Sequence, residues 1–457
     1  MFPSFLQLRS HLEAIIKDKT RQGHETGGLS ARLDDLPDSF DGLYAFALAL
    51  AGLPLRDGWE YVEPNDWPGI RAELHPGRPL GAIRPITAPE ARERVQAAFL
   101  GSVVGCMLGK PIEINPTLDE IEAALTPLGE WPINDYLTEA AAHNFPRGPH
   151  PDWRDTVRES LRLVAPDDDI NYTLLGMLAL EEHGPNFTRQ QLLRSWFKML
   201  PSGFTWGPER ATLAKVTLSS LPFAEPDPSD ETLEEWASVL NPHDEFCGAL
   251  IRADAYGYAY PGEPERAAEL AWRDSSLTHR RTGIYGAMFA AAAISAAFTA
   301  KNPLEIFEIA IQFVPQRSRF YAIVSDSLLQ VRASKTWREG YDRIHGRYRQ
   351  YSHCHVYQEC GTLINTLAFA QNVGHGVCLQ VMQGNDTDSF GATAGSILGA
   401  YFGPGRLEAR WLEPFSDEVN TRLAGFRERS LSRLAERISL LPALVKQAGT
   451  TQLEGVK

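Results

Sequence analysis

An all-α fold is the class that the sequence predicts, and three observations support it. From about residue 87 onward, most segments place apolar residues at the spacing of a helix. Runs that alternate β-branched and polar residues, as strands do, are hard to find. Pro, Gly, Asn and Asp separate the helical segments, as is typical of short loops. We therefore predict a compact bundle of many helices, with no internal repeat of fixed period.

The first part of the chain differs from the rest in composition. Short amphipathic helices are predicted over 6–16 and 43–53, and Gly- and Pro-rich stretches such as Trp67-Pro68-Gly69 lie around them. Residues 1–85 are therefore interpreted as a small accessory region with an extended linker, which we expect to pack outside the body. The body is predicted to span residues 86–450.

The body opens with the pattern Thr87-Ala-Pro-Glu90, which is typical of a capping box at a helix start. This helix is predicted to run to Gly109. Gly101, Gly105 and Gly109 recur every four residues and give the helix one smooth face, which a neighbouring backbone or a ligand can approach closely. Glu113 follows shortly after the helix.

An acidic cluster opens the next long helix. Asp167, Asp168 and Asp169 precede an apolar segment that stops at Gly184-Pro185, a common helix-ending pair. Aspartate favours the N-cap and the positive end of the helix dipole, so these residues can simply cap the helix. Their other possible role is to bind a metal ion.

A second acidic cluster lies far downstream. Asp386 and Asp388, followed by Ser389, open a helix of small and apolar residues over 390–400. Carboxylate and hydroxyl oxygens are the hard ligands that Mg²⁺ and Mn²⁺ prefer. Charges at the start of a buried helix are costly unless something neutralises them. Two such clusters therefore favour one shared metal site.

The remaining predicted helices share the same apolar spacing. They cover 233–240, 263–272, 284–300, 303–313, 320–334, 359–370 and 419–441.

Composition excludes several classes of protein. The chain has 457 residues, of which 43% are hydrophobic, and a formal net charge of -14. That charge argues against a nucleic-acid surface, which requires a basic patch. The longest apolar run, 284–300, is short for a membrane span and is interpreted as a buried helix. The N-terminus lacks the pattern of a signal peptide. We expect a monomeric cytoplasmic protein with no membrane partner.

The five cysteines do not form the pattern of a disulfide framework, because they are odd in number and scattered. A reducing cytoplasm fits this distribution. The segment His353-Cys354-His355, with Cys360, suggests zinc. However, it lacks a second ligand pair at zinc-finger spacing, so the sequence favours a helix-entry segment with partly buried side chains.

Four motifs together resemble the ADP-ribosylglycohydrolase family. The first runs from Gly101 to Glu113 and is similar to the family pattern Gly-xxx-Gly-Asp-Ala-Leu-Gly-x-Pro-x-Glu. The second is Asp167-Asp168-Asp169. The third is Cys247-Gly248-Ala-Leu-Ile-Arg252 with Leu277-Thr278-His279, and the fourth is Asp386-Thr387-Asp388-Ser389. Residues 1–85 lie outside the resemblance. Cys106 stands where the family usually has Asp, and Ile170 where a Thr follows the Asp pair.

The resemblance implies an all-α bundle around two Mg²⁺ ions, with Mn²⁺ as an alternative. The implied metal ligands are Asp167, Asp168, Asp169, Asp386, Asp388 and Ser389. Glu113 would lie beside the metals as a catalytic acid or base, with Asp168 and Asp169 in the same catalytic centre.

The resemblance also implies a substrate site. The loop at Cys247 and Gly248 would present backbone N–H groups to a diphosphate, because helix starts attract anions. Arg252 would support that loop, or form a salt bridge with Asp254 or Asp274. His279 would contact the substrate or serve a structural role. Trp206, Trp131 and Tyr136 are candidates to stack on a base, although such aromatics usually belong to the core.

The implied activity is Mg²⁺-dependent hydrolysis of an ADP-ribosyl or related ribosyl N- or O-glycosidic bond. The expected partner is an ADP-ribose-like or ribosylated small molecule or protein. One alternative is a metal-dependent nucleotide phosphohydrolase, which would release phosphate instead of a ribosyl product. Another is an inactive ADP-ribose-binding regulatory protein, which metal titration combined with an activity screen would identify.

Overall fold

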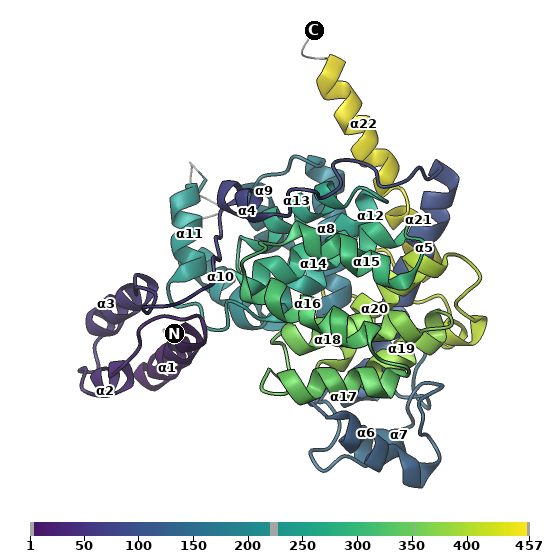
Figure 1. The fold of residues 1–457 in the computed structure, drawn as a ribbon, viewed down its shortest axis with the longest axis horizontal. Coiled ribbons are helices and arrows are strands. Elements are labelled where there is room, and N and C mark those ends of the chain that lie inside the picture. The colour runs from purple at the N-terminus through teal and green to yellow at the C-terminus, as the bar shows by residue number, and fades with distance from the viewer. Residues whose placement is uncertain (1–3, 220–226, 352, 455–457) are drawn as a thin grey trace.

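The computed structural model of the chain describes residues 4–219, 227–351 and 353–454, and its regular structure is helical (Figure 1). Backbone pairing outside helices is limited, in these residues, to isolated bridges. The α-helices are α1 (Phe5–Arg21), α2 (Leu29–Asp34), α3 (Phe40–Ala51), α4 (Trp67–Glu73), α5 (Ala88–Gly109), α6 (Leu118–Leu125), α7 (Glu139–His143), α8 (Asp168–His183), α9 (Arg189–Met199), α10 (Gly207–Leu218), α11 (Asp230–Ser238), α12 (Asp254–Ala259), α13 (Pro264–Ser275), α14 (Thr282–Ala297), α15 (Pro303–Ala310), α16 (Arg319–Arg332), α17 (Trp337–Tyr348), α18 (Tyr357–Phe369), α19 (Val373–Met382), α20 (Thr387–Phe402), α21 (Leu431–Ile438) and α22 (Leu441–Glu454). The 3₁₀-helices are η1 (Lys110–Ile112), η2 (Thr126–Leu128), η3 (Trp153–Asp155), η4 (Ser202–Phe204), η5 (Cys247–Arg252), η6 (Ile311–Phe313), η7 (Ala409–Trp411) and η8 (Glu413–Phe415).

The all-α prediction is confirmed, and most predicted helices are found within a few residues of their expected bounds. Local chemistry explains the boundaries. The Thr87 hydroxyl accepts a hydrogen bond from the Glu90 N–H at the start of α5, and Asp167 caps α8 by accepting from the Asp169 N–H. Gly184 ends α8.

The helix expected over 419–441 is wrong in its first half. Residues 419–430 form a loop, in which Val419 makes an isolated bridge with Val164. Gly425 has a left-handed φ of 77°, which a continuous helix cannot contain. The Ser430 hydroxyl then accepts from the Arg433 N–H and starts α21.

Helices α5 and α20 pack backbone to backbone along a seam of glycines. A Cβ added to Gly105 would lie 1.9 Å from the Gly391 carbonyl oxygen, and one added to Gly109 would lie 2.1 Å from that of Thr387. Only glycine permits this approach. The smooth face predicted for α5 is therefore the surface that receives α20, and the seam brings Glu113 and the second acidic cluster to the same end.

Helix α14 forms the centre of the body, and all of its side chains are buried. This confirms that the longest apolar run is a core helix. Helix α5, together with η1, is long and apolar enough to span a membrane. Its most apolar 18-residue stretch has a mean hydropathy of 1.4, but 83% of that stretch is buried inside the fold. Such burial is expected of a core helix in a helical bundle.

The N-terminal residues contain two parts. Helices α1, α2 and α3 lie to one side of the body (Figure 1) and share a small core of their own, to which the body contributes Val239. Residues 53–85 then run along the body. Within this strap, the Pro64 carbonyl accepts from the Tyr285 hydroxyl, and the Glu63 carboxylate pairs with Arg319 at 2.8 Å.

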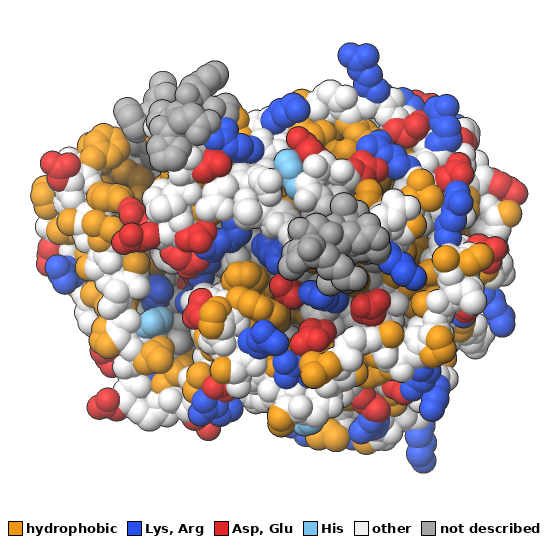
Figure 2. All heavy atoms as spheres, turned by 90° about the horizontal axis from the view of Figure 1, so that it is seen from above, with side chains coloured by type: hydrophobic (Ala, Val, Ile, Leu, Met, Phe, Trp, Pro, Cys, Tyr) orange, Lys and Arg blue, Asp and Glu red, His pale blue; other side chains and the backbone are white. Residues whose placement is uncertain are grey.

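Figure 2 shows one face of the molecule, on which acidic and basic side chains are interspersed.

Candidate metal centre and substrate cleft

The two acidic clusters meet around the side chain of Lys110. Its Nζ lies 2.8 Å from Glu113 Oε2, 2.8 Å from Asp167 Oδ2 and 2.9 Å from Asp388 Oδ2. Three helix ends position these groups, because Lys110 follows α5, Asp167 caps α8 and Asp388 lies in the first turn of α20. The ammonium is a buried cation held by three carboxylates.

The other predicted ligands surround this group. Asp168 is half-buried and faces the cleft described below, whereas Asp169 is 3% exposed and accepts a weak hydrogen bond from the Cys106 thiol at 3.8 Å. Asp386 is 2% exposed and precedes α20. The Ser389 N–H donates to Asp388 Oδ1 at 2.9 Å.

The electrostatics of the cluster follow from burial and crowding. Burial and neighbouring carboxylates raise the pKa of Asp168 and of Asp169 well above the ordinary value. Burial and the proximity of Asp388 likewise raise the pKa of Glu113. Asp388 differs: despite its burial, the Lys110 ammonium holds the pKa of this carboxyl well below its usual range.

Unpartnered oxygens in the cluster suit a divalent cation. Asp169 Oδ1 and Asp386 Oδ1 are buried and have no hydrogen-bond partner among the residues that the structure describes. Buried carboxylate oxygens are rarely left in this state, and hard cations bind such oxygens. The donors near Asp169 and Asp386 therefore fit a metal, whereas Glu113, Asp167 and Asp388 already share the Lys110 ammonium.

A polar cleft of about 260 Å³ opens beside the cluster. Lys110, Asp167 and Asp168 line its acidic side. Its remaining lining includes two exposed arginines and two exposed aromatic residues, namely Arg154, Arg422, Phe204 and Trp206. The Arg422 guanidinium lies 4.8 Å from the centre of the Phe204 ring. The cleft thus combines carboxylates with cations and flat apolar surfaces.

Of the three aromatics proposed to stack on a base, only Trp206 lines this cleft. Its side chain is 52% exposed. Tyr136 is buried, and its hydroxyl donates to the Trp411 carbonyl, so it belongs to the core. Trp131 packs half-buried against the same core.

The predicted substrate loop is connected to the cluster through Cys247, whose thiol lies 3.2 Å from Asp386 Oδ2. Gly248 lies against Glu209, where an added Cβ would be 2.6 Å from the carboxylate. Arg252 is 2% exposed and donates to the Gly248 carbonyl at 3.0 Å, which supports the loop. His279 is fully buried, and its Nδ1 lies 2.8 Å from the Thr278 hydroxyl.

The salt-bridge alternative for Arg252 is confirmed for Asp274 and wrong for Asp254. Arg252 pairs with Glu209 and, at 2.5 Å, with Asp274. Asp254 instead accepts hydrogen bonds from the Ser102 and Ser396 hydroxyls, between α5 and α20.

Sequence reasoning missed two parts of this region. Lys110 is one, although its position three residues before Glu113 in the first motif was a usable signal. The other is a group around Asp386. Its neighbour Cys354 has a thiol whose pKa is lowered to about 5 by the hydrogen bond with Cys247 and, against burial, by His353. Burial raises the pKa of the nearby Glu359 to about 8.

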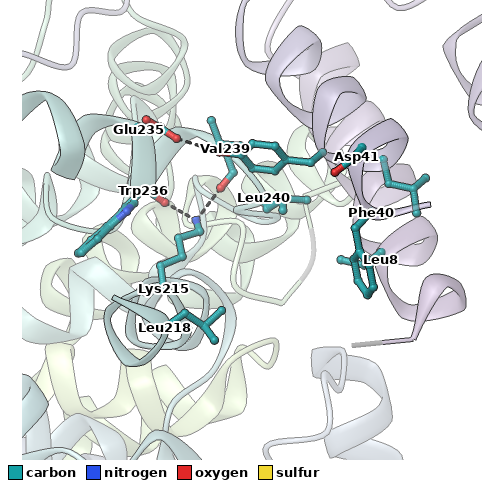
Figure 3. A pocket seen from close by; sticks show the side chains of 11 residues that line it. Leu8, Phe40, Asp41, Lys215, Leu218, Glu235, Trp236, Val239 and Leu240 are labelled. Atoms are coloured by element: carbon teal, nitrogen blue, oxygen red, sulfur yellow. Dashed lines mark hydrogen bonds between the residues drawn. The ribbon is translucent and has the colours of Figure 1, made fainter. Parts of the chain in front are cut away.

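A separate apolar pocket of about 580 Å³ lies between the N-terminal helices and α10 and α11 (Figure 3). Phe40 and Leu8 face it from one side, and Lys215 and Leu218 from the other. The Lys215 amine donates to the carbonyls of Trp236 and Val239, where α11 ends. None of the predicted site residues lines this pocket.

The all-α body thus brings the carboxylates of Asp167 and Asp168 to a polar cleft, beside Lys110. The family comparison is specific: the profile described as ADP-ribosylglycohydrolase matches residues 87–448. The chain therefore belongs to the ADP-ribosylglycohydrolase family and is a glycosidase-type hydrolase.

A solved structure described as an ADP-ribosylglycohydrolase-related protein complex is similar over 78% of this chain and 99% of its own, with 17% identity and a TM-score of 0.48. A search of curated proteins finds no match.

Proposed function

We propose that this protein hydrolyses an ADP-ribosyl N- or O-glycosidic bond, using divalent cations held by the Asp167–Asp169 and Asp386–Asp388 clusters. The observation that carries the proposal is the meeting of Glu113, Asp167 and Asp388 at the Lys110 ammonium. Lys110 and Asp167 also line a cleft that holds arginines and exposed aromatics. A substrate with a ribose, a diphosphate and a base needs carboxylates, arginines and aromatic rings, in that order.

The cleft suggests how such a substrate lies. Arg154 and Arg422 suit the diphosphate, because guanidinium groups bind phosphate oxygens in pairs. Trp206 and Phe204 are partly exposed, and each ring, with a guanidinium over it, offers aromatic surface for the base. The reacting ribose then lies over Asp168, next to Lys110.

The chain's own residues would move the proton and set the geometry. When bound, a divalent cation orients the ribose hydroxyls and lowers the pKa of a coordinated water. The Glu113 carboxyl exchanges the proton with the leaving group or with the attacking water. Before a cation occupies the position among the carboxylates, Lys110 orients Glu113 and Asp388 by direct ion pairs. Asp168 and Asp169 would hold a cation and the sugar in place.

The proposed cofactors are two Mg²⁺ ions, with Mn²⁺ as a substitute. The unpartnered oxygens of Asp169 and Asp386, which lie in separate groups of candidate ligands, are each available to a cation. The position among Glu113, Asp167 and Asp388 requires the Lys110 side chain to turn aside, since the ammonium lies within 2.9 Å of each carboxylate.

The test is a ribosyl-release assay with Mg²⁺, using an ADP-ribosyl-guanidine compound and an ADP-ribosyl-serine peptide. We expect Asp386→Asn and Asp388→Asn each to abolish release, because each removes an anionic ligand at nearly constant volume. Glu113→Gln is expected to lower turnover strongly and to keep ADP-ribose binding. Asp34→Asn, at an exposed site in α2, is the matched control. Full activity in either Asp variant would falsify the metal mechanism.

The binding-only alternative has one observation in its favour, namely that Lys110 already neutralises part of the cluster. It predicts ADP-ribose binding by calorimetry without release of any product. The phosphohydrolase alternative predicts inorganic phosphate instead of free ADP-ribose in the same assay.

A further inference from the structure

Three segments that are distant in the sequence bring sulfur and oxygen donors together beside Asp386. Cys247 begins η5, Cys354 lies in the loop before α18, and Asp386 precedes α20. The Cys247 and Cys354 sulfurs lie 3.2 and 3.5 Å from Asp386 Oδ2. One donor atom from each of these three residues lies within 4.8 Å of the other two.

His353 offers a nitrogen donor close to Asp386, in a second group that includes Glu113. One of its ring nitrogens lies within 4.8 Å of carboxylate oxygens of both Asp386 and Glu113. Two thiols and a carboxylate form a set of three donors, and the imidazole of His353, close to Asp386, is a candidate for the fourth ligand that a zinc-class cation binds tetrahedrally.

The observed distances agree with tetrahedral coordination. Metal–sulfur bonds of about 2.3 Å and metal–oxygen bonds of about 2.0–2.2 Å, at tetrahedral angles, separate sulfur from oxygen by roughly 3.5 Å. The two measured separations are 3.2 and 3.5 Å. Thiolate and imidazole donors select Zn²⁺-like cations, whereas Mg²⁺ prefers oxygen alone.

The buried Glu359 carboxylate hydrogen-bonds to the backbone of both the Cys354 segment and the Asp386 segment. Glu359 is 1% exposed, and its Oε1 accepts hydrogen bonds from the Cys354 N–H at 3.3 Å and the Asp386 N–H at 3.0 Å. The donors are therefore held by the fold. Asp386 is only 2% exposed, and its Oδ1 has no hydrogen-bond partner in the described residues. Cys354 and His353 are only half-buried, which leaves a route from solvent.

We propose that Cys247, Cys354, His353 and Asp386 bind a thiophilic divalent cation of the zinc class, at a site next to the carboxylate cluster and sharing Asp386 with it. This inference goes beyond the proposed hydrolysis and does not depend on it. The cation binds the two sulfurs as thiolates and His353 as a neutral imidazole, and any proton that these groups carry beforehand leaves to solvent. No electron is transferred.

The experiment is a Co²⁺ titration of the full-length, metal-free, reduced protein, followed by its absorption spectrum. Co²⁺ substitutes for Zn²⁺ and reports its ligands, because bound thiolates give near-ultraviolet charge-transfer bands and tetrahedral geometry gives intense visible bands. We expect both bands with one equivalent of Co²⁺, and their loss when Zn²⁺ is added.

Matched variants identify the ligands. Cys354→Ala and Cys247→Ala are each expected to lower the charge-transfer band by about half and to weaken Co²⁺ binding at least tenfold. Cys360→Ala is the control: Cys360 is also buried and lies on α18, but it is outside the donor set, so both bands persist. Asp168→Asn removes a ligand from the carboxylate cluster only and is also expected to keep both bands. Cys354 is half-buried, so its variant tests the site even if Cys247→Ala fails to fold.

Two results would overturn the proposal. One is the absence of a charge-transfer band, or a band that neither Cys247→Ala nor Cys354→Ala changes. The other is a disulfide between these residues, seen as two thiols missing from the titration of the unfolded protein and restored by a reductant. Neither result bears on the ribosyl-release assay, so the two proposals fail separately.

Discussion

Lys110 is the residue that most changes the interpretation of the site. We expect Lys110→Met to lower the free energy of unfolding of the metal-free protein by about 3–5 kcal/mol, because removing one partner of a buried ionic group leaves the others uncompensated. We also expect Mg²⁺ to raise the Tm of this variant more than that of the wild type, since the cation replaces the lost charge. Thermal unfolding in chelator and in Mg²⁺ measures both effects.

Lys17→Met, which removes an exposed lysine from α1, is the control for that experiment. A metal-free Lys110→Met protein with an unchanged or higher Tm would show that the ammonium does not stabilise the cluster.

Trp206 provides a residue-scale test of substrate orientation. We expect Trp206→Ala to raise KM for ADP-ribosyl substrates about tenfold, with a smaller effect on kcat, because the ring is proposed to stack on the base far from the reacting bond. Trp206→Phe keeps a ring and is expected to restore most of the affinity. Equal KM values in wild type and Trp206→Ala would exclude this side chain from the binding site.

Lys215 predicts a pH dependence away from the candidate metal centre. Burial, together with nearby Arg280, lowers the pKa of its amine to about 7 in the folded protein, against 10.5 as the ordinary value. Between these values the unfolded chain binds more protons, so folding becomes more favourable as pH rises from about 7 towards 10.5.

Denaturant unfolding of wild type and Lys215→Met at pH 7 and pH 9 measures this effect. We expect the wild type to gain stability relative to the variant with rising pH, by at most about 1.4 kcal/mol per pH unit. The same difference at both pH values would contradict the lowered pKa.

At the scale of elements, the seam between α5 and α20 gives the sharpest prediction. Gly105→Ala is expected to destabilise the protein by about 3 kcal/mol or more, because its Cβ would lie 1.9 Å from a backbone oxygen that no rotamer change can move. Chemical denaturation measures the loss. Gly346→Ala in α17, where an added Cβ meets nothing within 4 Å, is the control and is expected to be neutral or stabilising. Equal effects of the two substitutions would refute tight packing at the seam.

Helix positions were predicted well from the sequence where they depend on residues close to one another in the chain. The cap at Thr87, the stop at Gly184 and the apolar face of α14 each depend on neighbouring residues. The loop over 419–430 shows the limit, because its residues have helical spacing, but Gly425 and a bridge to Val164 hold it extended.

The candidate site was only partly predictable for a related reason. The aspartate pairs are visible as motifs, and the resemblance indicated that they belong together. The ion pairs of Lys110 and the approach of Cys354 to Cys247 depend on how distant helices pack, which no local pattern reveals.

At the scale of the whole molecule, the strap over 53–85 connects the N-terminal helices to the body. Glu63 is buried against Arg319, so its removal leaves a buried guanidinium with one partner fewer. We expect deletion of residues 1–52 to lower Tm modestly and to keep the body folded. Deletion of residues 1–85 is expected to cost about 3–5 kcal/mol more, for the reason given for buried ion pairs.

Thermal unfolding of the two truncated proteins, with Glu63→Gln in the full chain as a third sample, separates the contributions. If both deletions have the same Tm, the strap adds no stability, and residues 1–85 act as a single accessory region, as the sequence analysis predicted.

A ribosome delivers α5 long before it delivers α20. Until residues 387–402 emerge, the glycine face of α5 has no helix to pack against. The helix with which α5 makes its most extensive contact, α20, has not yet been synthesised. We expect the carboxylates to come together late in folding, because contacts between segments so far apart in the sequence form slowly. Until then they remain hydrated and well separated, which delays their mutual repulsion until a cation, whether Lys110 or a metal, is there to offset it.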